Sequence, residues 1–268
     1  MLLVLDVGNT NTVVGIYREE ELLCHWRLTS DRRTGDELAV YLLNLMSLAK
    51  IPREALKGAI ISSVVPSLEA AWVQGIESSL GLEALKVALS MDLGLSVEVR
   101  EPRNVGADRL VNAVAGVQRY GTPLLLVDFG TAVTWDAVDC RGAYIGGAIA
   151  PGLNVSVEAL FGKTAKLPRV PLEVPPQAIG KDTVEAIQSG ILYGYAGMVD
   201  GLVRRMWKEL GKETPVVATG GQAAILKDHS ETITHVDPWL TLEGLRILYC
   251  RNLPPGSDAL HASKNGHG

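Results

Sequence analysis

The sequence predicts an α/β protein built from two similar halves, and three observations lead to this prediction. Apolar stretches of strand length alternate along the chain with stretches of helical periodicity. A short pattern occurs twice, as DVGNTNT at residues 6–12 and as DFGTAVT at residues 128–134. The 268 residues are 47% hydrophobic but only 5% aromatic and include 28 glycines, which suits an α/β fold with many tight turns.

The first half is expected to begin with strands and to continue with alternating helices and strands. Leu38, Leu42 and Leu45 recur at helical spacing, and a loop is expected around Pro102. The expected elements are strands at 1–6, 12–18 and 21–28, helix 35–49, strand 58–63, helix 67–79, strand 84–89 and helix 106–119.

The second half repeats this order. The segment 165–182 contains four prolines and is expected to be an extended connection, and the tail at 254–268 is expected to be disordered. The other expected elements are strands at 123–128, 132–139 and 142–149, helices at 153–162 and 183–210, strand 215–218, a short helix, strand 232–236 and helix 241–251.

The repeated pattern indicates an internal duplication. In each copy an aspartate, Asp6 or Asp128, ends an apolar strand and is followed by a glycine turn and two more strands. We expect the boundary near residues 115–122, which gives halves at 1–118 and 119–253. A cleft between two such halves is a common place for a ligand.

Charge and cysteine content narrow the functional classes. The net charge is −5 and no run of Lys or Arg stands out, so neither nucleic acid nor an anionic membrane is an expected partner. Cys24, Cys140 and Cys250 are far apart and show no zinc-ligand spacing, as expected of free thiols in a reducing cytosol. Neither a signal peptide nor an apolar stretch of about 18 residues is evident, so a cytoplasmic protein is expected.

The two Asp-x-Gly turns are candidate phosphate sites. Gly8 permits a sharp turn and a close approach of the backbone, and successive N–H groups of such a turn can bind an anion. Asp6 and Asp128 have the wrong charge for phosphate but the right charge for the cation that accompanies it. For one copy alone an ordinary hairpin turn is the better explanation, but the second copy favours a site that clamps a polyphosphate. The usual GxxxxGK[ST] and GxGxxG motifs are absent.

A third candidate is GADR at residues 106–109, at the start of a predicted helix. Asp108 is either an ordinary stabilising charge near the helix N-terminus or a base that accepts the proton of an attacking hydroxyl. Arg109 is suited either to bind a substrate carboxylate or to neutralise charge in the transition state, and Gly106 would let a substrate approach the backbone.

Taken together, these motifs resemble the type III pantothenate kinases, which belong to the superfamily of actin-like and sugar-kinase-like ATPases. The resemblance covers roughly residues 1–250. Further motifs follow in the family's order, namely GGAIAPGL at 146–153, LP at 167–168, IGKDTVEAIQSG at 179–190, ATGGQA at 218–223 and LTLEGL at 240–245. The resemblance implies two ribonuclease-H-like halves with ATP in the cleft between them.

The resemblance also implies roles for individual residues. Asp108 would be the catalytic base, Asp128 would bind a monovalent cation (K⁺ or NH₄⁺), and Asp6 is a possible contact to the Mg²⁺ that accompanies ATP. The implied ATP and phosphate contacts are Asp6, Val7, Gly8, Asn9, Thr10, Asn11, Thr12, Val13 and Thr131. The implied pantothenate contacts are Val99, Gly106, Ala107, Asp108, Arg109 and Thr183, with Thr183 supplied by the second subunit of a homodimer.

Two features leave alternatives open. Val99 stands where the family often has a tyrosine that encloses the substrate, so this side of the pocket is expected either to be looser or to be closed by another residue. The small-residue face GILYGYAG at 190–197 is either the dimer interface or ordinary core.

The expected function is ATP-dependent phosphorylation of pantothenate to 4′-phosphopantothenate, the first step towards coenzyme A. The alternatives are another small-molecule kinase or a polyphosphate phosphatase of the same fold, and a nucleotide-binding accessory protein without catalytic activity.

Overall fold

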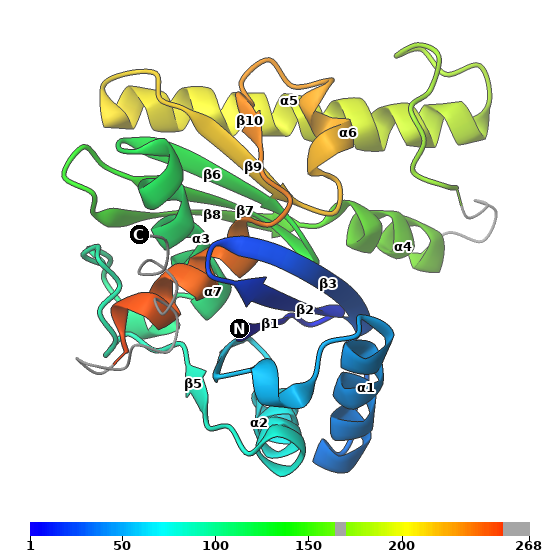
Figure 1. Cartoon of the computed structure of the whole chain (residues 1–268). Coiled ribbons are helices and arrows are strands. Elements are labelled where there is room, and N and C mark those ends of the chain that lie inside the picture. Colours follow the sequence, from blue (N-terminus) through cyan, green and yellow to red (C-terminus); the bar gives the residue numbers. More distant parts are fainter. Residues whose placement is uncertain (164–169, 254–268) are drawn as a thin grey trace, which may run out of the picture. The chain divides into compact units, whose positions relative to one another are not determined.

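The structure is a computed structural model that describes residues 1–163 and 170–253. These residues form two five-stranded sheets with helices (Figure 1), which confirms the predicted α/β fold. Two compact units are present: unit 1 comprises residues 1–95, 101–115 and the described residues from 241 onward, and unit 2 comprises residues 96–100 and the described residues of 116–240. The LP motif at 167–168 and the expected disordered tail at 254–268 lie outside the described residues.

The elements follow the predicted order. The strands are β1 (Leu2–Val7), β2 (Asn11–Arg18), β3 (Glu21–Thr29), β4 (Gly58–Ser63), β5 (Ala84–Lys86), β6 (Leu124–Phe129), β7 (Ala132–Val138), β8 (Tyr144–Pro151), β9 (Val216–Gly220) and β10 (His235–Val236). The helices are α1 (Gly35–Leu48), α2 (Pro66–Leu80), α3 (Ala107–Tyr120), α4 (Leu153–Lys163), α5 (Thr183–Leu210), α6 (Ala223–Lys227) and α7 (Leu240–Arg251), with short 3₁₀ turns at Arg53–Ala55 and Pro102–Asn104.

Both sheets have the same topology. In unit 1 the order is β3-β2-β1-β4-β5, and in unit 2 it is β8-β7-β6-β9-β10. The central strand, β1 or β6, pairs antiparallel with the strand that follows it and parallel with β4 or β9. The internal repeat inferred from the sequence is therefore visible as a repeated strand order. The division into halves at 118 and 119 stays a prediction.

Each face of the unit 1 sheet is covered by helices. On one face, alternate residues of β1, β2 and β4 form a core with α1 and α2, including Leu5, Leu42 and the fully buried Trp72. On the other face, α7 packs so closely on Gly15 and Gly58 that a methyl group at either position would clash with a side chain of the helix. Because successive strand residues point to opposite faces, Leu2, Val4 and Asp6 face the α7 side.

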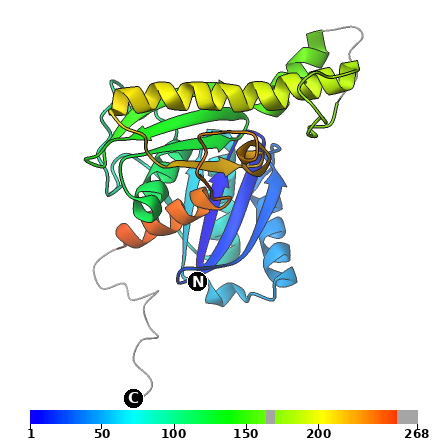
Figure 2. The ribbon, with the colours of Figure 1, turned by 90° about the horizontal axis from the view of Figure 1, so that it is seen from above.

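The unit 2 sheet is covered on one face by the long helix α5. Figures 1 and 2 both show α5 lying lengthwise over this sheet. Leu192, Tyr195, Val199 and Val203 of the helix pack on inward-facing residues of β6, β7 and β9. Since Val127 and Phe129 face α5, Asp128 between them faces the opposite side of the sheet.

Two strands are shorter than predicted. The strand expected at 84–89 ends at Lys86, because a turn closed by the hydrogen bond from Met91 N to Ala88 O follows it. The strand expected at 232–236 is limited to His235–Val236, because the backbone N–H groups of Thr232 and Ile233 donate to side chains rather than to a neighbouring strand.

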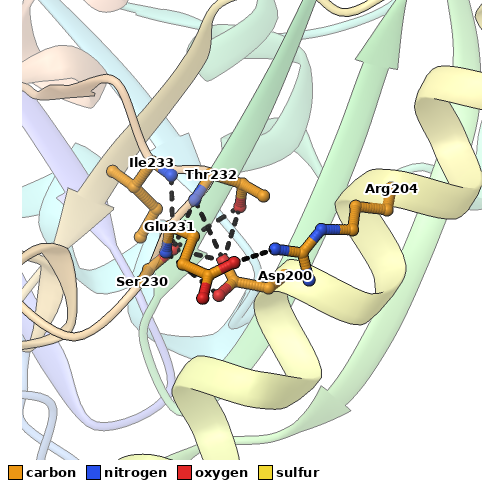
Figure 3. Close-up of polar contacts among 6 residues, drawn as sticks. All are labelled: Asp200, Arg204, Ser230, Glu231, Thr232 and Ile233. Atoms are coloured by element: carbon orange, nitrogen blue, oxygen red, sulfur yellow. Dashed lines mark hydrogen bonds and ion pairs between the residues drawn. The ribbon is translucent and has the colours of Figure 1, made fainter.

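Residues 230–232, just before β10, donate hydrogen bonds to the carboxylate of Asp200 in α5 (Figure 3). Its Oδ1 accepts hydrogen bonds from Ser230 Oγ at 2.6 Å, from Thr232 Oγ1 at 2.8 Å and from Thr232 N at 3.1 Å. Its Oδ2 accepts a hydrogen bond from Glu231 N at 3.0 Å. The buried carboxylate therefore ties the segment before β10 to the long helix.

The hydrogen bonds outweigh the cost of burying this charge. Burial alone would raise the pKa of Asp200, but the donors from Ser230, Glu231 and Thr232 together hold it below its ordinary value. A lowered carboxyl pKa means that the stabilisation is present above the ordinary pKa and is lost as the pH falls through the lowered one.

We expect Asp200→Asn to lower the free energy of unfolding by about 1.5–3 kcal/mol at pH 7, the range for hydrogen bonds to a charged group. The difference from the unsubstituted protein should shrink below about pH 4, where the carboxyl group takes up a proton. Urea unfolding at both pH values measures it. Glu231→Gln is the control, since it removes only the exposed ion pair with Arg204 and should cost at most about 1 kcal/mol. Equal losses for the two variants would contradict this role of Asp200.

Candidate active site

Asp6 lies near the end of β1, in the centre of the unit 1 sheet. It pairs with Val13 of β2 on one side and with Ser62 of β4 on the other. Its side chain is half-buried and faces the α7 side of the sheet. The carboxyl ends of the parallel strands β1 and β4 meet at the same edge of the sheet, which is where α/β sheets bind their ligands.

The turn after Asp6 is tight and exposed at its tip. Gly8 N donates to Asn11 O at 3.0 Å, and a methyl group at Gly8 would lie 3.0 Å from the same oxygen. Asn9 and Thr10 are exposed between them. Short polar residues on a closely folded backbone are what a phosphate site requires.

Thr12 is buried, unlike the exposed Asn9 and Thr10 at the tip of the turn. Its side chain is 1% exposed and its Oγ1 lies 3.0 Å from Ser30 Oγ, so it joins the turn to the end of β3. It also lines a cavity of about 270 Å³ together with residues of α1 and α2. Because Thr12 pairs with Val7 rather than with Asp6, this cavity opens on the face opposite Asp6. If Thr12 contacts ATP, its backbone is therefore the part that does so.

The GADR segment lies at the same edge of unit 1 as the first turn. A methyl group at Gly106 would be 3.8 Å from Val64, which directly follows β4, and 2.5 Å from Asp108 Oδ1. Gly106 thus leaves the space that the carboxylate of Asp108 occupies. The same oxygen accepts a hydrogen bond from Arg109 N at 2.8 Å. Further along α3, Val111 packs on Gly244 of α7, which places this helix on the face that carries Asp6.

The environment of Asp108 makes it a stronger base than an ordinary carboxylate. Burial raises its pKa, and this effect exceeds the lowering by the backbone N–H and the positive charge of Arg109. A carboxylate that is costly to keep ionised gains more from accepting a proton. The sequence alternative of a plain helix N-terminal charge would lower the pKa instead.

Asp128 has the corresponding place in unit 2. It pairs with Thr134 of β7 and with Thr219 of β9. Thr134 Oγ1 donates to Asp136 at 3.2 Å, and the hydroxyl of Tyr144 donates to the same buried carboxylate at 2.7 Å. A row of oxygen atoms thus runs over the face of the sheet opposite α5.

Two glycines close the second turn around Asp128. Gly220 has a φ of +88°, and a methyl group there would lie 2.6 Å from Asp128 Oδ1 and 2.6 Å from Phe129 O. A methyl group at Gly152 would lie 2.4 Å from Gly130 O and 2.5 Å from Thr131 O. Gly220 combines a positive φ with close contacts, and Gly152 has the close contacts alone, so a side chain is excluded at both positions.

The site offers few carboxylates, so a cation bound there would take most of its oxygen ligands from a nucleotide, from water or from backbone carbonyls. Among the described residues, no three His, Cys, Asp or Glu side chains gather into a metal site. Mg²⁺ commonly takes one or two carboxylates and completes its shell with phosphates and water, so the single carboxylate of Asp6 is compatible with Mg²⁺ bound to a nucleotide. That Asp128 binds a monovalent cation stays a prediction.

The predicted site residues fall in both units. Asp6 to Val13 and Gly106 to Arg109 share an edge of unit 1, whereas Asp128 and Thr131 lie together in unit 2. Their meeting at one common site stays a prediction. Val99 also belongs to unit 2, 3.6 Å from where a methyl group of Gly146 would be. Thr183 is exposed at the start of α5, in an open groove with Leu160, Ile187 and Ile191.

Some residues that shape the site were not singled out from the sequence. Gly152 and Gly220 were noted only as parts of longer motifs, and Ser30 and Ser62 were not noted at all. The sequence could have indicated the two glycines, because each lies shortly after a predicted strand, where a turn is expected. The serines had none, because their importance depends on which strands become neighbours.

Comparison with known proteins identifies the family. Residues 2–205 match the family described as type III pantothenate kinase. A type III pantothenate kinase of Syntrophotalea carbinolica is 50% identical over 257 residues, which cover 94% of this chain and 99% of that protein. Another, of Moorella thermoacetica, is 47% identical over 253 residues, which cover 94% of this chain and 100% of that protein.

Solved structures of remote relatives share the fold. One is a conserved putative Baf family transcriptional activator of Campylobacter jejuni, with a TM-score of 0.58, 17% identity and coverage of 93% of this chain and 98% of that one. Another is the activator of a 2-hydroxyisocaproyl-CoA dehydratase of Clostridium difficile with bound ADPNP, with a TM-score of 0.52, 14% identity and coverage of 100% and 98%. At these identities the similarity shows the fold alone, that of the actin-like ATPases.

We expect Gly220→Ala to be more harmful than the same change at another glycine of positive φ. Gly211 has a φ of +77° but open space around it, so Gly211→Ala measures the backbone cost alone, about 1–3 kcal/mol. Gly220→Ala should lower the free energy of unfolding further, since it also pushes on Asp128 and Phe129. Urea unfolding of both variants makes the comparison, and equal losses would show that the contacts around Gly220 are unimportant.

Proposed function

The chain belongs to the type III pantothenate kinase family and is therefore a kinase that phosphorylates pantothenate for coenzyme A biosynthesis, and we propose that Asp108 is the base of this reaction. The observation that carries the proposal is the half-buried carboxylate of Asp108, which fills the space beside Gly106 and has a raised pKa. In the proposed reaction Asp108 accepts the proton of the primary hydroxyl of pantothenate. The hydroxyl oxygen attacks the γ-phosphorus of ATP, and ADP leaves.

The first turn would bind the phosphates of ATP. Gly8, Asn9 and Thr10 offer backbone N–H groups and short polar side chains at its exposed tip, and Thr131 would make a second contact from unit 2. Mg²⁺ bound with ATP would neutralise phosphate charge, and Asp6 would be the residue of unit 1 that holds it. The ADPNP bound to the remote relative of the same fold supports a nucleotide site in this architecture.

Asp128 would hold a monovalent cation, K⁺ or NH₄⁺. Asp128 Oδ1 and Phe129 O would both lie 2.6 Å from a methyl group at Gly220, so a carboxylate oxygen and a carbonyl oxygen border the same small space, and oxygen is the type of ligand such cations prefer. Replacing K⁺ by Na⁺ in the assay should lower kcat, and full activity in Na⁺ alone would exclude this role.

The remaining contacts concern pantothenate. Arg109 would pair with the carboxylate of pantothenate, because a guanidinium recognises a carboxylate through two hydrogen bonds. Val99 would line the pocket, and Thr183 of a second subunit would complete it. This last contact requires the homodimer that we propose below.

We propose that the exposed face of α5 forms the dimer interface. A methyl group at Gly190, Gly194 or Gly197 would meet nothing within 4 Å, so none of the three is needed for packing within the chain. Small residues on an exposed helix face let a second helix approach closely.

For the location we propose the cytoplasm, in keeping with the three free cysteines. No helix among the described residues is long and apolar enough to span a membrane.

We expect Asp108→Asn to lower kcat by about 10²–10⁴, the range for loss of a general base, with binding of Mg·ATP retained. The assay is release of ADP that depends on pantothenate. Asp36→Asn is the matched control, since Asp36 is also an aspartate in the first turn of a helix but lies in α1. Unchanged kcat in Asp108→Asn would remove the assigned role, and absence of pantothenate-dependent ADP release in the unsubstituted enzyme would refute the function.

The raised pKa of Asp108 makes a prediction about stability as well. The ionised carboxylate is less favourable in the folded chain than in the unfolded one, so stability is lost as the pH rises through the raised pKa. At pH 7 we therefore expect Asp108→Asn to unfold at the same temperature as the unsubstituted protein or at a higher one. The gain should vanish at a pH below the ordinary carboxyl pKa.

We expect Gly194→Glu to convert the dimer into a monomer. The monomer accommodates the longer side chain because the space around Gly194 is open, whereas an interface would bury two extra charges. Light scattering coupled to gel filtration gives the mass. Lys208→Glu introduces the same residue at an exposed position of the same helix and should stay dimeric. A monomeric unsubstituted protein would refute the interface.

A further inference from the structure

Ser62 of β4 carries a buried hydroxyl that the fold does not use. The residue is 0% exposed, and its Oγ has no hydrogen-bond partner within the part of the chain that the structure describes. Nearly all buried polar groups in proteins are paired, because an unpaired one has given up its bonds to water without replacement. A buried hydroxyl without a partner therefore calls for an explanation.

The strand register places this hydroxyl beside Asp6. Ser62 and Asp6 are direct neighbours on the parallel strands β4 and β1, which lie about 4.8 Å apart in a sheet. Residues in register on adjacent strands point to the same face, and on this face Gly58 of β4 contacts α7. Asp6 and Ser62 thus share the face on which α3 presents Asp108.

The hydroxyl of the next residue, Ser63, is paired, unlike that of Ser62. Ser63 points to the other face, where its Oγ accepts a hydrogen bond from Val65 N at 3.0 Å and donates to Val65 O at 3.2 Å. Of these two consecutive serines, Ser63 closes a turn with its hydroxyl, whereas the hydroxyl of Ser62 makes no hydrogen bond to the described residues. We proposed above that the Asp6 carboxylate holds the Mg²⁺ of the nucleotide. The unpaired hydroxyl of Ser62 lies next to this carboxylate and can donate a hydrogen bond to it.

We propose that Ser62 is a positioning residue for Asp6. Its hydroxyl donates a hydrogen bond to the Asp6 carboxylate when that carboxylate holds Mg·ATP, and so fixes the direction in which the other carboxylate oxygen points. A hydroxyl suits this task because it orients a carboxylate without cancelling its charge, as a lysine would. This inference rests on the role proposed above for Asp6.

The test compares stability with nucleotide binding in Ser62→Ala. Removal of an unused buried hydroxyl should leave the unfolding temperature of the ligand-free protein unchanged or raise it. The affinity for Mg·ADP, measured by titration calorimetry, should fall about tenfold, as expected for loss of one hydrogen bond to a charged group. In EDTA, where Asp6 has no metal to hold, the affinity for ADP should change little.

Two further variants make the result specific. Ser63→Ala removes a paired hydroxyl, so it should lower the unfolding temperature while the effect of Mg²⁺ on ADP affinity is kept. Ser62→Cys replaces the hydroxyl by a slightly larger thiol that is a weak donor, so its affinity for Mg·ADP should lie between those of Ser62→Ala and the unsubstituted protein.

Three outcomes would overturn the proposal. An unstable or unfolded Ser62→Ala would show that the hydroxyl stabilises the fold. An unchanged affinity of Ser62→Ala for Mg·ADP would show that the hydroxyl has no part in nucleotide binding. An equal loss of ADP affinity in EDTA would show that its effect does not depend on Mg²⁺. Each is distinguishable from failure of the proposed function, because that failure appears as absence of pantothenate-dependent ADP release in the unsubstituted enzyme.

Discussion

The double pairing of the central strands determines where the acidic side chains of this protein lie. β1 and β6 each pair with an antiparallel strand on one side and with a parallel strand on the other. The antiparallel partner requires a tight turn directly after the aspartate, and the parallel partner brings a second strand end to the same edge. Asp6 and Asp128 are therefore held at positions where a turn rich in N–H groups and the end of a neighbouring strand meet.

Glycine is the second requirement of this arrangement. Around Asp128 the backbone of Gly220 and Gly152 comes so close to other main-chain oxygens that no side chain fits. Gly106 does the same for the carboxylate of Asp108. In each case the absence of a side chain creates the room in which a charged group, a cation or a substrate can lie near the backbone.

Buried polar groups in this chain fall into two kinds. Asp200 accepts four hydrogen bonds, its pKa is lowered, and it fastens a loop to a helix. Asp108 has a raised pKa and Ser62 has no partner among the described residues, so both cost free energy in the ligand-free protein. The well-bonded carboxylate of Asp200 stabilises the fold, whereas Asp108 and Ser62, both in unit 1, remain available for ligands.

The sequence by itself determined the class of fold, the order of the elements, the repeat and the family, because hydrophobic periodicity and short motifs are local properties of the chain. It also marked Asp6, Asp108 and Asp128, since each stands in a motif. Only the tertiary structure decided that β5 and β10 are short, that Thr12 faces away from Asp6, and that Ser62 lies beside Asp6 without a hydrogen-bond partner among residues 1–163 and 170–253. These facts depend on strand register and on hydrogen bonds between residues far apart in the chain, such as those from Ser230 and Thr232 to Asp200, which no local pattern encodes.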